Sequence, residues 1–196
     1  MDDPVPQSQN SLTTCVARQI EDFGVVVVLA PETSTADDLG SIQGAKLRVV
    51  DDKAEPEITA FTLCHLFGHL IQLSDRKRYE HLIDPVAAPP PVALPESFWH
   101  AFYEYEHEAF RYGATVLKLC TCDSKDIMAK YSGFMEVDFQ QFRNYISTGL
   151  RTDREAYRAL ARTAFATSGD LRILSPKPLP LVIDWKTLRI EHIAIV

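Results

Sequence analysis

The stretch EITAFTLCHLFGHLIQLSD, from Glu57 to Asp75, decides the fold. It contains no proline, and at about 100° per residue its apolar side chains surround most of the helix, which is typical of a helix buried in the middle of a domain. His65 and His69 stand four residues apart on its one polar stripe. Side chains at this spacing lie about 5–6 Å apart at Cβ, so both imidazoles can converge on one metal ion. The stretch therefore predicts a central helix that carries half of a metal site.

Length and composition indicate one folded domain. The chain has 196 residues, of which 46% are apolar, enough to bury a core. The formal charge of -7 is opposite to that of a phosphate-binding surface, which needs clustered Lys and Arg, so we expect no direct contact with nucleic acid. The N-terminus is acidic and polar, and no apolar run approaches about 18–20 residues. We expect a soluble, cytoplasmic protein without membrane association.

The four cysteines, at positions 15, 64, 120 and 122, do not have the spacing of a disulfide framework. In a reducing compartment cysteines remain thiols. We therefore expect four free cysteines.

The order of predicted elements indicates an α+β fold in which helices dominate the middle of the chain. A polar connection is expected over 31–44 and an extended proline-rich loop over 83–95. The predicted helices cover 11–23, 57–75, 96–119, 138–147 and 153–167. A fully buried strand is expected at 25–29, a second strand with alternating residues at 45–50, and a terminal hairpin at 181–185 and 188–196.

A third metal ligand must come from another element, because a tetrahedral ion cannot take all its ligands from one helical face. The helix predicted over 96–119 carries Glu104 and Glu108 beside its apolar face. Glu108 stands at the border of that face and is expected to look inward, whereas Glu104 lies further into the polar side and is the fallback. The predicted metal ligands are His65, His69 and Glu108.

The residue after the first histidine is Leu66, where the zinc helix H-E-x-x-H has a glutamate. That glutamate is the general base, and proton transfer of this kind typically contributes a factor of about 10²–10⁴. Leucine can neither accept nor deliver a proton. Glu57, Glu104 or Glu106 could in principle substitute, but none adjoins the first histidine. We therefore predict no catalytic residue.

A plainer interpretation of the same residues stays open. His65 and His69 can be polar side chains whose neighbours satisfy them within a buried helix, and Glu108 can be a surface carboxylate paired with Arg111.

Two segments together resemble the ImmA/IrrE family of zinc metallopeptidase-like proteins. Residues 61–71, FTLCHLFGHLI, are similar to the family motif F-T-x-x-H-E-x-G-H-x-x, and residues 108–113, EAFRYG, to E-A-x-x-F-A. The likeness covers about residues 24–120. It departs from the family at Leu66, in the longer spacer before Glu108, and at residues 119–122, LCTC, which replace the usual Leu-Met-Pro.

The resemblance implies a zincin-like, gluzincin-type helical core with a small sheet and a bound zinc ion. It divides the chain into an N-terminal segment with a short helix (1–23), a metallopeptidase-type domain (24–122) and C-terminal helices with a hairpin packed on that domain (123–196). Relatives in bacteria and phages are implied to act on helix-turn-helix repressors in stress responses, mobile elements and phage control, or to be paired with toxins.

The function expected from these features is that of a pseudoenzyme. The chain is interpreted as a catalytically degenerate member of this group, which binds zinc and regulates another protein, such as a repressor, by binding it. Two alternatives remain: an active zinc metalloprotease that uses an unusual general base, and a structural or interaction subunit without metal.

Overall fold

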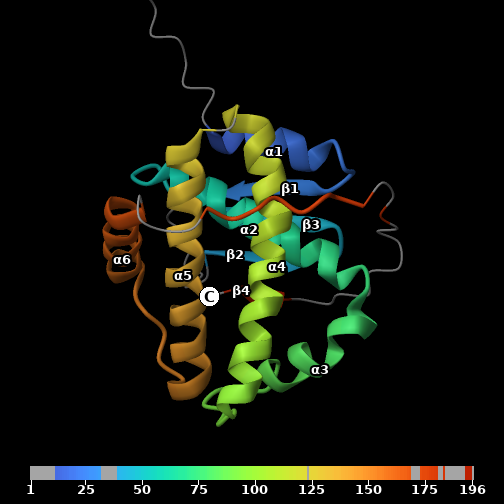
Figure 1. The fold of residues 1–196 in the computed structure, drawn as a ribbon, viewed down its shortest axis with the longest axis vertical. Helices are drawn as coiled ribbons and strands as arrows, with labels where there is room; N and C mark the ends of the chain where they lie inside the picture. Colours follow the sequence, from blue (N-terminus) through green and yellow to red (C-terminus); the bar gives the residue numbers. More distant parts are fainter. Residues whose placement is uncertain are drawn as a thin grey trace, which may run out of the picture.

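The computed structural model describes residues 12–31, 39–122, 124–168, 173–180, 183 and 193–195. Within them the chain forms six helices and one four-stranded sheet, which confirms the α+β class (Figure 1). The elements are α1 (Leu12–Glu21), β1 (Val26–Ala30), β2 (Gly40–Gln43), β3 (Lys46–Val50), α2 (Pro56–Leu73), α3 (Arg76–Val86), α4 (Glu96–Thr121), α5 (Lys125–Thr148), α6 (Arg154–Thr167) and β4 (Ile193–Ile195).

Helix α2 is the centre of the molecule, as predicted. Every residue from Ile58 to Leu73 is buried. The long helix α4 crosses it so closely that a Cβ on Gly68 would lie 2.0 Å from the carbonyl oxygen of Ala109, and a Cβ on Gly113 would lie 2.5 Å from the carbonyl oxygen of Cys64. Only glycine permits such an approach of two backbones, so these two positions fix how α2 and α4 face each other.

The sheet has the strand order β1-β3-β2-β4. Strands β1 and β3 are parallel, whereas β2 is antiparallel to both β3 and β4. The expectation of a fully buried first strand is wrong, because β1 is an edge strand on which Val26 is 56% and Leu29 is 38% exposed. A run of β-branched residues suits an edge strand as well as a central one, so composition alone could not separate them.

Two elements lie where connections were expected. Strand β2 falls within the predicted polar connection and forms a hairpin with β3 around Gly44, whose φ of 55° lies in the left-handed region that glycine favours. It was missed because Ile42 is its one large apolar residue. Helix α3 extends through the start of the predicted loop. Pro85 lies in its last turn and removes one N–H donor there, but the backbone N–H of Ala87 still donates to the backbone oxygen of Ile83 at 3.0 Å.

The C-terminal helices pack on the same core. Helix α5 begins at Lys125, thirteen residues before the predicted start, and runs beside α4 in the opposite direction (Figure 1). Helix α6 packs against α5. The predicted hairpin lies outside the described residues except for Ile183, which is in no strand, and residues 193–195, which form β4 and pair with β2. The division of the chain at 23/24 and 122/123 stays a prediction.

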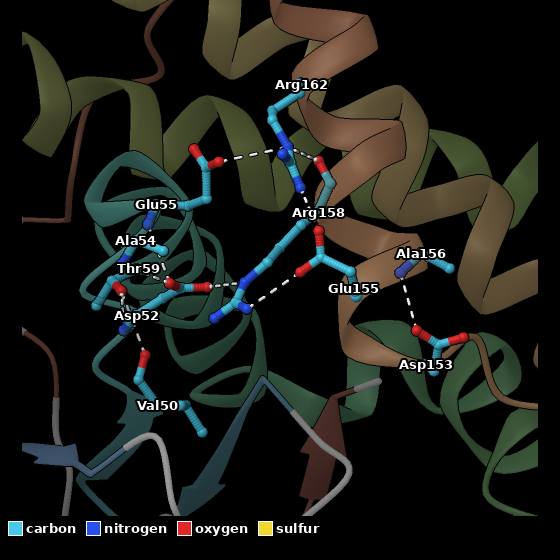
Figure 2. Close-up of polar contacts among 10 residues, drawn as sticks. All are labelled: Val50, Asp52, Ala54, Glu55, Thr59, Asp153, Glu155, Ala156, Arg158 and Arg162. Atoms are coloured by element: carbon cyan, nitrogen blue, oxygen red, sulfur yellow. Dashed lines mark hydrogen bonds and ion pairs between the residues drawn. The ribbon is translucent and has the colours of Figure 1, made fainter.

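A buried ion pair joins α6 to the beginning of α2 (Figure 2). Asp52 accepts hydrogen bonds from the backbone N–H groups of Ala54 and Glu55, both at 3.0 Å, and its other oxygen accepts from Nε of Arg158 at 2.7 Å. The backbone N–H of Asp52 donates to Thr59 Oγ1 at 2.9 Å. One carboxylate therefore orders the turn before α2 and holds α6 against it.

A disulfide connects α1 to the end of α4. Cys15 and Cys120 are bonded with their Cα atoms 5.7 Å apart, so the expectation of four free thiols is wrong for this pair. The two residues are separated by 105 positions, and only the packing of α1 on α4 brings them together. Cys64 and Cys122 are free. In the described part of the chain, no helix is both long and apolar enough to cross a bilayer.

Candidate metal centre

Two histidines of α2 and one glutamate of α4 meet in the buried core. Nε2 of His65 lies 2.9 Å from Oε2 of Glu106, and Nε2 of His69 lies 3.2 Å from the same oxygen. The possible ligand atoms of the three residues all lie within 4.8 Å of one another. The close crossing at Gly68 produces this arrangement, since it brings α4 against the histidine face of α2. We call these three residues the triad.

The His65 ring is held from behind by a carboxylate of α5. Its Nδ1 lies 3.1 Å from Oδ2 of Asp138, whose other oxygen accepts a hydrogen bond from the Tyr157 hydroxyl at 2.8 Å. Both partners are buried. A carboxylate behind a histidine fixes the orientation of the ring and leaves the other nitrogen for a metal. Asp138 therefore directs Nε2 of His65 toward Glu106.

The His69 ring is held by an amide whose own orientation is fixed. Nε2 of Gln72 donates to the backbone oxygen of Tyr105 at 2.8 Å and to Glu108 at 3.2 Å. Since both partners are acceptors, the amide nitrogen must face them, and Oε1 of Gln72 accepts from Nδ1 of His69 at 3.0 Å. Nδ1 thus carries a proton. Nε2 of His69 faces Glu106.

Burial and neighbouring charges shift the pKa values of His65 and Glu106. Burial lowers the pKa of His65, but hydrogen bonds and charges from Asp138 and Glu106 outweigh it and raise that pKa to about 9. Burial raises the pKa of Glu106, but interactions with His69 and His65 lower it to about 2. His65 is therefore an imidazolium between two carboxylates when no cation is bound, and a metal ion would take the place of its proton.

The triad has the donor set of a zinc site. Two imidazole nitrogens and one carboxylate oxygen are the three protein ligands of many zinc sites, with further coordination positions left open. Each imidazole is supported through Nδ1, as ligating histidines usually are. His65, His69 and Glu106 could therefore hold a divalent metal ion.

The glutamate that meets the histidines differs from the one predicted. Glu108 is directed away from the triad, and accepts hydrogen bonds from Tyr79, Lys177 and Gln72. Glu106 follows buried Phe102 by four residues and precedes buried Ala109 by three, so helical spacing places it within the apolar stripe of α4.

The remaining sequence candidates lie away from the triad. Glu104 is exposed. Glu57 pairs with Lys130 at 3.1 Å, near the beginning of α2. Asp138 was not predicted as a site residue. The signal that could have marked it is its spacing: it lies four residues after Phe134 and four before Phe142, so it shares a helix face with two apolar residues.

Leu66 lies on the sheet side of α2. It is fully buried, and a Cβ added to Gly40 of β2 would lie only 2.7 Å from Cδ1 of Leu66. The position beside the first histidine therefore packs an aliphatic side chain against the sheet. It offers no group that can exchange a proton.

A cavity of about 470 Å³ opens beside the triad. Its lining includes four polar residues, which we call the floor: His65, His69, Glu106 and Asp138. The other lining residues are mostly apolar and come from α2, α3, α4, α5 and the loop after α3: Leu73, Ile83, Val86, Ala87, Ala88, Pro89, Pro90, Phe102, Tyr105, Phe142, Tyr145, Ile146 and Arg151. The triad is thus accessible through a pocket of a size typical for small-molecule sites.

No protein-family model, curated protein or solved structure matches this chain.

Proposed function

We propose that the chain is a catalytically degenerate metallopeptidase-type protein of the ImmA/IrrE kind, with a zincin-like core that binds zinc at His65, His69 and Glu106. It acts in the cytoplasm as a regulatory module that binds another protein. The observation that carries the proposal is the triad itself: two helical histidines four residues apart face one buried carboxylate of a second helix.

The residues around the triad suit binding rather than hydrolysis. Zinc, when bound, would supply two positive charges to a site that holds the carboxylates of Glu106 and Asp138. Asp138 is engaged by His65 and Tyr157, and Leu66 has no titratable group. A hydrolase needs a free base beside the reacting atoms, and in our proposal the chain has no such base there.

The proposed partner is a transcriptional repressor or another regulatory protein. This part rests on the resemblance of residues 61–71 and 108–113 to the family motifs. The negative charge of the chain, -7, favours a protein partner over direct contact with nucleic acid. The partner can be sought by co-purification from the cells that produce the protein, with the Glu106→Gln variant as the comparison.

Zinc titration by calorimetry tests the metal site. We expect one zinc ion per chain, and we expect Glu106→Gln to weaken binding at least about a hundredfold through loss of a ligand, a larger effect than the tenfold to hundredfold typical of residues behind the ligands. Glu108→Gln is the matched control, since it lies two residues away on the same helix; its effect should be clearly smaller. Equal effects of both variants would contradict the assignment of Glu106.

Two further results would overturn the proposal. Peptide hydrolysis by the zinc-loaded protein that His65→Ala abolishes would indicate an active protease. Absence of zinc binding, with a melting temperature unchanged by zinc or chelator, would indicate a structural subunit, because a ligand that binds only the folded state must raise its stability.

A further inference from the structure

The walls of the triad cavity have a chemistry of their own. Phe102 of α4, Phe142 and Ile146 of α5 and Val86 of α3 contribute apolar side chains, whereas the triad and Asp138 contribute polar ones. Arg151, just after α5, is the one cationic residue among the described lining residues apart from the histidines. A ligand of this cavity therefore needs an apolar body and a polar head.

The cavity wall formed by the proline-rich loop is fixed to α5. The backbone N–H of Val92 donates to the backbone oxygen of Ile146 at 2.7 Å. At Gly149, an added Cβ would lie 3.5 Å from Cδ of Pro91, so loop and helix end are in contact. The end of α3, the start of α4 and the end of α5 lie at the same end of the molecule (Figure 1). These contacts hold that wall against α5, and the cavity of about 470 Å³ has room for a small, compact molecule.

In the part of the chain that the structure describes, β2 has no open edge with which an extended polypeptide could pair. Strand β2, against which Leu66 packs, is hydrogen-bonded to β3 on one side and to β4 on the other. Addition of a peptide as a further strand requires an open edge. A peptide therefore cannot enter the site as a strand added to β2.

We propose that the cavity binds a compact, apolar monocarboxylate whose carboxylate meets the triad and whose apolar body lies against Phe102, Phe142 and Ile146. This inference rests on the proposed zinc site. A divalent ion offsets the charges of Glu106 and Asp138, and Arg151 adds a positive charge at the wall, so an anionic head is accepted when the ion is bound. Without the ion the floor carries two carboxylates against the one imidazolium of His65, so it disfavours an anion and favours a cationic head.

Calorimetry with straight-chain alkanoates, from butanoate to decanoate, tests the proposal on the zinc-loaded protein. Each added methylene that enters the cavity should tighten binding about fourfold until the cavity is filled. Alkylamines of the same lengths, titrated into the zinc-free protein, form the second series. Affinity that is independent of chain length in both series would overturn the inference.

Three variants locate the binding site. Ala88→Trp, on the cavity wall, should weaken binding of the longer alkanoates at least about tenfold, whereas Ala93→Trp, exposed in the same loop and outside the cavity, should leave it unchanged. Phe142→Ala enlarges the cavity and should move the optimum to longer chains. Equal affinities in Ala88→Trp, Ala93→Trp and the parent would place the ligand elsewhere and refute the inference.

The two series also separate this inference from the proposed function. A chain that takes up no zinc but binds alkylamines in a length-dependent way would refute the metal site and the carboxylate head together, while the apolar cavity remained a binding site. A chain that binds zinc but shows no length dependence with alkanoates would refute the cavity proposal alone.

Discussion

Replacing Gly68 with alanine tests the contact on which the triad depends. The added Cβ would lie 2.0 Å from the carbonyl oxygen of Ala109 and 2.6 Å from its carbon, and ordinary contact begins near 3.4 Å. Helices α2 and α4 must therefore separate by about 1.4 Å. Overpacking of this kind costs about 3 kcal/mol, and the better helix propensity of alanine returns about 1 kcal/mol. We expect Gly68→Ala to lower the free energy of unfolding by about 2 kcal/mol.

Gly68→Ala should also weaken zinc binding. Ala109 lies one helical turn after Glu106, so a shift of α4 at Ala109 moves Glu106 away from the two histidines. Urea unfolding and zinc calorimetry measure the two effects. Gly133→Ala is the matched control: it lies inside α5, gains the same helix propensity, and its Cβ would lie 3.1 Å from the carbonyl oxygen of Ala164. Its stability should change by less than about 1 kcal/mol. Unchanged stability and zinc affinity in Gly68→Ala would refute the reasoning.

Other contacts give three more predictions. Asp138→Asn removes the charge behind His65 and should reduce zinc affinity by about ten- to a hundredfold in calorimetry, with an unchanged circular dichroism spectrum. Arg158→Met leaves the buried carboxylate of Asp52 without its partner and should lower the free energy of unfolding in urea by about 3 kcal/mol. Cys15→Ser should cost about 2–4 kcal/mol under oxidising conditions and nothing in the presence of a reductant, which would be contradicted by equal losses in both.

The centre of the fold could be predicted from local sequence. A helix that is apolar on nearly all sides must be buried whatever surrounds it, so α2 and the shared direction of His65 and His69 followed from residue spacing alone. The third carboxylate depended on the phase of α4. The prediction placed Glu108 at the border of the apolar stripe and chose it as the ligand, whereas the acidic residue within the stripe is Glu106, two positions earlier.

The features that were missed depend on distant partners. Strand β2 is too short for a pattern of its own and exists through its pairing with β3 and β4. The bond between Cys15 and Cys120 requires α1 to lie on the end of α4. Asp138 shows its role only when α5 is placed beside α2. Such neighbours across the chain are not encoded in the periodicity of any one segment.

The pairing of β2 with β4 also affects how the protein is made. About 150 residues separate the two strands, and at synthesis rates of about 5–20 residues per second β2 emerges from the ribosome many seconds before its partner. During that interval one side of β2 has unpaired N–H and C=O groups, which other chains can engage. Aggregation during expression should therefore depend on how quickly the ribosome completes β4 after β2.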